Sequence, residues 1–194
     1  KLILPMPSPR QVATRSPPAL ARRPLALMVS ALLLSAAISG AAQAQAFPPS
    51  INLGSLSGAD GFRLDGVAAE DRSGYSVSAA GDVNGDGLGD LIVGAPLADP
   101  NGSDSGSSYV LFGRSTGFAA TLALSSLNGS NGFRLVGAAA YDRSGYSVSA
   151  AGDINGDGLG DLIVGAWGAD PNGEDSGSSY VLFGRSTGFA ATLA

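Results

Sequence analysis

The sequence predicts an all-β protein that consists of two four-stranded blades of an incomplete β-propeller, preceded by a signal peptide. Two observations lead to this fold class. From Leu53 onward the chain repeats itself at a constant spacing of 71 residues, so that Leu53 to Ala123 and Leu124 to Ala194 are two copies of one unit. Each copy contains four short segments rich in Val, Ile, Tyr or Phe, separated by clusters of Gly, Asn, Asp, Pro and Ser. Four-stranded units at a long, fixed period are typical of propeller blades.

The strand segments are clearest in the second copy. We expect its strands at Gly132 to Gly137, Ser144 to Gly152, Asp161 to Ala166 and Ser178 to Gly184. The third segment, DLIVGA, predicts a strand that is buried on both faces and closely approached by neighbouring backbone. The alternative is a pair of independent β-sandwich domains, but a unit of this size with few large apolar side chains would bury little surface alone. Propellers close with about four to eight blades, so we expect further blades of the same propeller outside this sequence.

Residues 1–46 differ in composition from the rest of the chain. Basic residues precede an uncharged, weakly apolar run from Leu25 to Ala42, and Ala44-Gln45-Ala46 has the small-x-small form of a signal-peptidase site. We therefore predict a secretory signal peptide cleaved after Ala46. A membrane anchor is the alternative, because the run is close to the minimum of about 18 residues for a transmembrane helix.

The predicted signal peptide defines the remaining domains and their location. The first blade unit is expected at residues 47–123 and the second at residues 124–194. Because the leader is removed, the mature chain is expected to have no membrane span. We expect it to be secreted, periplasmic or on the cell surface.

The residues after Ala46 carry all 16 acidic side chains of the chain but only six arginines, which gives them a formal charge of −10. Phosphate binding needs a basic surface, so nucleic acid is not an expected partner. This part also contains no Cys, His, Lys or Met, which excludes disulfides, zinc sites built on Cys or His, histidine general bases and Schiff-base lysines. We expect no catalytic residues here, and a stability that depends on core packing or on bound ions.

Residues 82–90, with the sequence DVNGDGLGD, form the most informative motif. Oxygen-bearing groups occur at positions 1, 3, 5, 7 and 9, namely Asp82, Asn84, Asp86, the carbonyl group of Leu88 and Asp90. Alternate oxygens around one point suit a hard cation, and Ca²⁺ with about six to eight oxygen ligands fits better than the smaller Mg²⁺. An EF-hand would need Glu at position 12, where Val93 stands. The second copy repeats the pattern from Asp153 to Asp161, which disfavours the alternative of a hairpin turn without an ion.

Three further motifs accompany this loop in the first copy. Phe112-Gly113 and Gly94-Ala95-Pro96 occur in fixed order after it, and Gly74-Tyr75-Ser76-Val77 precedes it. With these motifs each copy resembles an FG-GAP repeat, the blade of the integrin α-subunit β-propeller. The resemblance covers residues 53–194. The second copy departs from the family pattern at Trp167, which stands in place of the proline.

The resemblance implies that Ca²⁺ is held in a hairpin loop on one face of the propeller. Its ligands would be Asp82, Asn84, Asp86, Leu88 (carbonyl) and Asp90 in the first copy, and Asp153, Asn155, Asp157, Leu159 (carbonyl) and Asp161 in the second. The implied function is an extracellular module for cell adhesion or ligand binding, with a protein or glycan of unknown identity as ligand. The alternative is an accessory propeller of a secreted hydrolase, as in proteins similar to glycosylphosphatidylinositol-specific phospholipase D.

Overall fold

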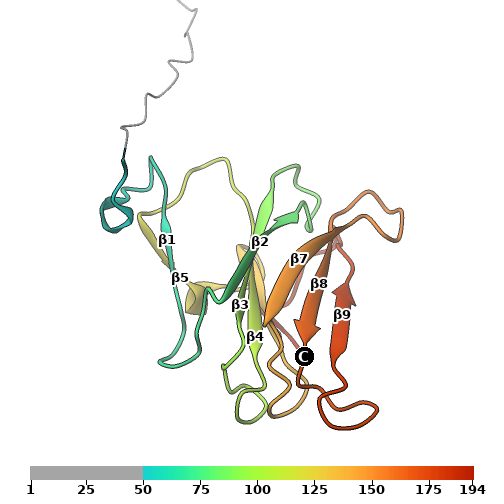
Figure 1. Ribbon diagram of the computed structural model, residues 1–194. Coiled ribbons are helices and arrows are strands. Elements are labelled where there is room, and N and C mark those ends of the chain that lie inside the picture. Colours follow the sequence, from blue (N-terminus) through green and yellow to red (C-terminus); the bar gives the residue numbers. More distant parts are fainter. Residues whose placement is uncertain (1–49) are drawn as a thin grey trace, which may run out of the picture. The chain divides into compact units, whose positions relative to one another are not determined.

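The computed structural model describes residues 50–194, and the predicted signal peptide, residues 1–46, lies outside this range. The described residues form ten β-strands and two 3-10 helices but no α-helix (Figure 1). None of these helices is long or apolar enough to cross a membrane. The strands are β1 (Arg63–Asp65), β2 (Ser76–Gly81), β3 (Asp90–Ala95), β4 (Ser107–Leu111), β5 (Thr121–Ala123), β6 (Gly132–Val136), β7 (Ser147–Gly152), β8 (Asp161–Ala166), β9 (Ser178–Leu182) and β10 (Thr192–Leu193), and the helices are η2 (Leu53–Ser55) and η3 (Leu124–Ser126). The all-β prediction is confirmed, and the four strands expected in the second copy are β6 to β9.

The strands form three sheets. The largest has the order β10-β6-β4-β3-β2, in which β10 runs parallel to β6 and all other neighbours are antiparallel. A second sheet has the order β7-β8-β9, and β1 and β5 form a parallel pair. The largest sheet takes β2, β3 and β4 from the first copy but β6 from the second, with Tyr109 opposite Arg134. The repeat period alone does not predict that β6 joins the sheet of the first copy, because the period is the same wherever the unit is taken to begin.

A β-bulge ends the first strand of each hairpin. The pairing of β2 with β3 shifts register between Ala79 and Gly81, and that of β7 with β8 shifts between Ala150 and Gly152. Gly81 and Gly152 have φ angles of 76° and 79°, which residues with a Cβ atom adopt only at a cost. The bulge turns the chain out of the sheet, so this glycine positions the acidic loop that begins at Asp82.

Both faces of the largest sheet bury apolar side chains, although Val77 and Leu91 are exposed. Ile92 and Val110 are fully buried on the face that packs against β7 and β8. Val93 and Tyr109 are buried on the opposite face, in a cluster with apolar side chains of β5 and η3. Fully burying one such side chain stabilises the fold by about 1.5–3 kcal/mol. The expectation that the DLIVGA strand is buried on both faces is therefore met by β3 in the first copy. It is not met by β8 in the second copy, where Ile163 is 36% exposed.

The two larger sheets approach each other closely where β3 passes the turn before β7. A Cβ atom on Gly94 would collide with the carbonyl oxygen of Gly145. The Ser76 hydroxyl donates a hydrogen bond of 2.7 Å to the same oxygen. Figure 1 shows β2 and β7 side by side at this junction. Close packing between the two sheets thus requires a glycine at position 94 of the DLIVGA segment.

We expect Gly94→Ala to lower the free energy of unfolding by about 1–3 kcal/mol, because the added methyl group overpacks this junction. Gly89 has open space where a Cβ atom would lie. Gly89→Ala is therefore a matched control that should change stability by less than about 0.5 kcal/mol. Urea unfolding followed by circular dichroism measures both variants. Equal stabilities would contradict a close contact at Gly94.

Candidate metal centre

The segment from Asp82 to Asp90 forms the hairpin loop between β2 and β3, and Asp82 organises it. Its Oδ1 atom accepts hydrogen bonds from the N–H groups of Gly85 and Asp86 at 2.8 and 3.1 Å, and its Oδ2 atom accepts one from Gly87 at 2.8 Å. Gly85 and Gly87 have φ angles of 78° and 84°, which lets the backbone curl around the carboxylate. The local sequence therefore wraps the loop around its first acidic residue.

Asn84 and Asp86 form the outer side of the loop. Asn84 Oδ1 accepts a hydrogen bond from the Asp86 N–H at 2.9 Å, and the Asn84 amide nitrogen donates to Asp86 Oδ2 at 3.0 Å. Asp86 Oδ1 accepts from the Leu88 N–H at 2.8 Å. Asp86 is exposed and Asn84 is half-buried, so an ion can reach their oxygens from solvent.

Asp90 closes the loop and is buried. Its Oδ2 atom accepts a hydrogen bond from the Val83 N–H at 2.9 Å and its Oδ1 atom accepts one from the Gly113 N–H at 2.8 Å. Burial raises the pKa of Asp90; the two hydrogen bonds oppose this rise, and the charges of Asp86 and Asp82 add to it. A cation beside these carboxylates would offset the cost of the buried negative charge.

The second loop, between β7 and β8, has the same geometry. Asp153 accepts hydrogen bonds from the N–H groups of Gly156, Asp157 and Gly158 at 2.7, 3.1 and 2.8 Å. Asp161 is fully buried at the end of the loop, as Asp90 is in the first. The structure thus places all the residues predicted as ligands in two equivalent loops.

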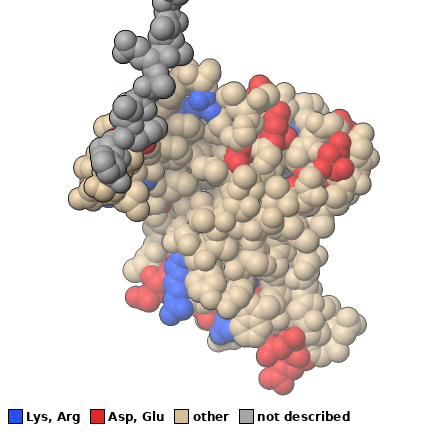
Figure 2. Space-filling view, turned by 45° about the horizontal axis from the view of Figure 1, so that its top comes forward, with Lys and Arg blue, Asp and Glu red and all other residues tan. Residues whose placement is uncertain are grey.

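The two loops are neighbours at one end of the sheets. The Gly160 N–H donates to the carbonyl oxygen of Asp82 at 2.7 Å, and the Arg185 N–H donates to that of Val83 at 2.9 Å. Figure 1 shows the β2–β3 and β7–β8 loops side by side, and Figure 2 shows acidic side chains in the upper part of the surface as well as at its lower end. Each loop contributes three carboxylates, so the two neighbouring loops bring carboxylates of both copies close together.

Among residues 50–194, no three acidic side chains converge into a cluster that could hold a metal ion as they stand. The oxygens nevertheless fit a hard cation, because an ionised carboxylate offers about four lone-pair sites. Asp82 uses three of its sites for N–H groups, whereas Asp86 and Asp90 each use two. Every carboxylate of the loop therefore keeps at least one site for a cation, and the ligand set stays a prediction.

Comparison with known protein families agrees with this arrangement. The FG-GAP repeat family matches residues 73–111 and 144–182. The chain carries two FG-GAP repeats. Each matched segment runs from the turn before the first hairpin strand, through the acidic loop, to the third strand of the sheet. Each FG-GAP repeat of this chain therefore contains one candidate metal site.

The chain is also similar to integrin α subunits. It is 38% identical over 96 residues to integrin alpha pat-2 of Caenorhabditis elegans, 38% over 107 residues to integrin alpha-PS2 of Drosophila melanogaster, and 37% over 131 residues to integrin alpha-IIb of Homo sapiens. These alignments cover 50%, 55% and 65% of this chain but 7%, 7% and 12% of the relatives. The chain thus corresponds to a small part of the curated relatives that it matches.

In both FG-GAP repeats the Phe-Gly motif is bonded to the acidic loop. The N–H groups of Gly113 and Gly184 donate to Asp90 and Asp161 at 2.8 and 2.9 Å. A Cβ atom on Gly113 would lie 2.6 Å from the carbonyl oxygen of Gly89, so glycine is needed to bring this N–H group to the carboxylate. No local sequence pattern connects these residues, because 23 positions separate them.

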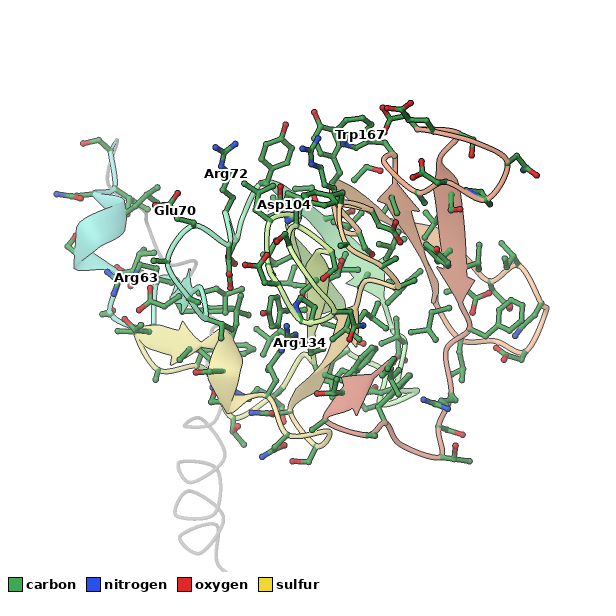
Figure 3. The ribbon with its side chains drawn as sticks, turned by 90° about the horizontal axis from the view of Figure 1, so that it is seen from below. Arg63, Glu70, Arg72, Asp104, Arg134 and Trp167 are labelled. Carbon is green, nitrogen blue, oxygen red and sulfur yellow. The ribbon has the colours of Figure 1, made fainter. Side chains whose placement is uncertain are left out.

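The opposite end of the FG-GAP repeats carries aromatic and arginine side chains. The ring centroids of Tyr75 and Tyr146 are 4.8 Å apart, those of Tyr146 and Trp167 are 6.0 Å apart, and the Arg143 guanidinium lies 4.8 Å above the Trp167 ring. Arg143 also pairs with Asp104 at 3.8 Å; Figure 3 labels Asp104 and Trp167 in this region. The two ends of the sheets therefore differ in chemistry.

We expect Asp90→Ala and Asp86→Ala to differ in calcium-free buffer. Asp90→Ala leaves the buried Val83 N–H and the Gly113 N–H without an acceptor, which should lower the free energy of unfolding by about 1–3 kcal/mol. Asp86→Ala removes an exposed carboxylate and should cost less than about 1 kcal/mol. Urea unfolding measures both values. A larger loss for Asp86→Ala would contradict the structural role assigned to Asp90.

Proposed function

We propose that this chain is a calcium-binding extracellular β-propeller module for cell adhesion or ligand binding, similar in this respect to integrin α subunits. The observation that carries the proposal is the pair of acidic loops. They have the same alternate oxygens, the same hydrogen bonds around Asp82 and Asp153, and neighbouring positions at one end of the sheets. Two hairpins that served only as turns would not need identical oxygens at alternate positions.

Electrostatics supports Ca²⁺ as the cofactor. Three carboxylates in each loop repel one another, and one Ca²⁺ ion reduces the formal charge of a loop from −3 to −1. Extracellular modules bind Ca²⁺ with dissociation constants of about 0.1–1 mM. At about 2 mM free Ca²⁺, each site then stabilises the folded state by about 0.6–1.8 kcal/mol. This is a substantial part of the stability of a small domain.

Chemistry and sequence similarity support binding rather than catalysis. The residues after Ala46 contain no His, Cys or Lys, so their serines have no histidine or lysine to act as general base. Integrin α subunits from several species match half or more of this chain. The proposed ligand is an extracellular protein or glycan, reached after export by the predicted signal peptide.

Calcium titration by calorimetry tests the proposal. We expect two sites in the unmodified chain, one site in Asp86→Ala or Asp157→Ala, and none in the double variant. The physical reason is that position 5 of each loop supplies a charged ligand for which the loop has no substitute. Thermal unfolding with and without about 2 mM Ca²⁺ should show the largest stabilisation for the unmodified chain, a smaller one for each single variant and none for the double variant.

The matched control removes two carboxylates away from the loops. Asp65 and Glu174 lie outside the loops and are not buried. Asp65→Ala/Glu174→Ala lowers the negative charge by the same amount as the double loop variant, so it should keep both sites. If the unmodified chain binds no Ca²⁺ at millimolar concentration, or if the control loses as many sites as the loop variant, the proposed metal function is wrong.

A further inference from the structure

The first acidic loop is held by the second copy as well as by its own hairpin. The Gly160 N–H group donates a hydrogen bond of 2.7 Å to the carbonyl oxygen of Asp82, and the Arg185 N–H group donates one of 2.9 Å to that of Val83. Both donors belong to the second copy. The two peptide groups that connect the predicted ligands Asp82 and Asn84 are therefore fixed by the neighbouring copy.

Val83 anchors the loop in the apolar junction between the sheets. Its side chain is 1% exposed and belongs to a buried cluster that includes Phe133 and Phe189 of the second copy. Its N–H group donates a hydrogen bond of 2.9 Å to Asp90 Oδ2. One residue thus joins apolar packing against the second copy to the buried carboxylate that closes the loop.

The backbone of the second loop fits closely against the start of the first. A Cβ atom on Gly160 would lie 3.0 Å from the nitrogen and 3.3 Å from the carbonyl oxygen of Asp82. A Cβ atom on Gly85 would lie 3.0 Å from the Cδ2 atom of Leu159. Gly160 does not have a positive φ angle, so the missing side chain serves this close approach rather than a special backbone conformation.

A continuous series of backbone hydrogen bonds joins the buried carboxylates of the two loops. The Gly184 N–H donates to Asp161 Oδ1 at 2.9 Å, and the next N–H group, that of Arg185, donates to the carbonyl oxygen of Val83. The Val83 N–H in turn donates to Asp90. A displacement of either loop therefore strains groups that hold the other.

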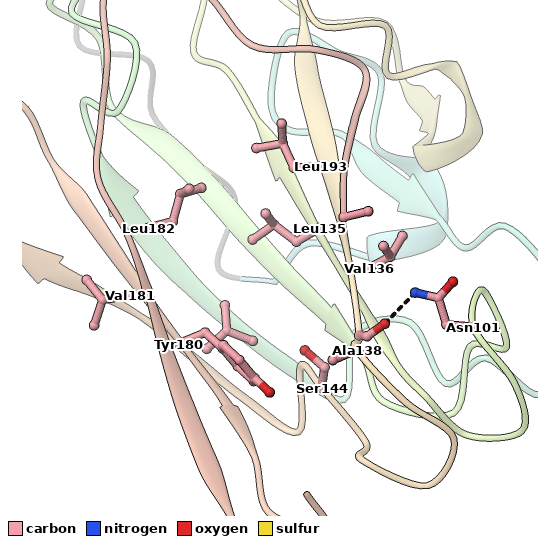
Figure 4. A pocket seen from close by; sticks show the side chains of 12 residues that line it. Asn101, Leu135, Val136, Ala138, Ser144, Tyr180, Val181, Leu182 and Leu193 are labelled. Atoms are coloured by element: carbon pink, nitrogen blue, oxygen red, sulfur yellow. Dashed lines mark hydrogen bonds between the residues drawn. The ribbon is translucent and has the colours of Figure 1, made fainter. Parts of the chain in front are cut away.

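The opposite end of the junction has contacts that involve neither loop. The Asn101 amide nitrogen donates to the carbonyl oxygen of Gly137 at 2.6 Å (Figure 4). The Arg143 N–H donates to the carbonyl oxygen of Asp104 at 3.0 Å. Asn101 and Asp104 lie between β3 and β4, whereas the first acidic loop precedes β3. These contacts join the same two copies and serve as an internal reference.

We propose that the second copy positions the first metal site, with Gly160 and Arg185 as positioning residues, and that a cation in the first loop strengthens the contact between the copies in return. The inference rests on the proposed calcium function. Metal–ligand distances are fixed to within about 0.2 Å, so the peptide groups that carry Asp82 and Asn84 must be held in place. Coupling of this kind is reciprocal: the factor by which the contact raises calcium affinity is the factor by which calcium strengthens the contact.

Calorimetry on two variants that lack the second site tests the positioning role. Asp157→Ala keeps only the first site, and adding Gly160→Ala places a methyl group against the backbone of Asp82. We expect the second substitution to raise the Kd of the first loop about 10-fold or more, as removal of groups that orient metal ligands usually does. Gly66→Ala in the same background is the matched control. Its Cβ atom would lie 3.0 Å from that of Ser73, an equally tight contact outside both loops, and it should leave the Kd unchanged.

Hydrogen exchange measured by NMR tests the reciprocal effect without any change at Gly160. In Asp157→Ala, saturating Ca²⁺ fills only the first loop. We expect exchange of the Arg185 N–H to slow about fivefold or more, and that of the Arg143 N–H to slow less, because the coupling acts through the loop contact. A general stabilisation of the fold would slow exchange at both positions equally.

The outcomes separate this inference from the proposed function. If Asp157→Ala binds no Ca²⁺ at millimolar concentration, the proposed function is wrong and this inference fails with it. If Asp157→Ala binds Ca²⁺ but adding Gly160→Ala changes the Kd no more than adding Gly66→Ala does, the positioning role alone is overturned. Equal slowing of exchange at Arg185 and Arg143 overturns it as well.

Discussion

A β-sheet with apolar side chains on both faces must be covered on both, and the arrangement of residues 50–194 follows from this constraint. β3 and β4 direct Ile92 and Val110 to one face and Val93 and Tyr109 to the other, and all four are buried. The second sheet covers the first face, while β5 and η3 contribute to the cover of the other. A unit of 71 residues has too little apolar surface to cover itself. Stability therefore resides largely in contacts between units.

The same packing brings the acidic loops together. β2 lies beside β7, and each strand ends in a bulge that sends its hairpin loop out at the same end of the sheets. Carboxylates of the two loops are thereby concentrated, and the backbone hydrogen bond from Gly160 to Asp82 links one loop to the other. A cation in either loop would lower the repulsion in both. The proposed cation binding would therefore be coupled to sheet packing.

Part of the candidate site follows from local sequence and part from tertiary contact. Asp82 collects N–H groups from the next five residues, and a pattern of glycines and oxygens is enough to predict such a loop. Asp90 depends on the N–H group of Gly113, which reaches it across the sheet. No local rule pairs these two residues. The short strands β5 and β10 also escaped prediction, because two or three residues show no periodicity.

The sequence by itself determined the 71-residue repeat, the main strand segments and the acidic loops, because these depend on turn chemistry and on alternation over a few neighbouring residues. Tertiary structure decided that β6 completes the sheet of the first copy and that Arg143 pairs with Asp104. It also decided that Ile92 is buried while its equivalent Ile163 is 36% exposed. Identical segments have identical local preferences, so only the surface packed against each copy could distinguish them.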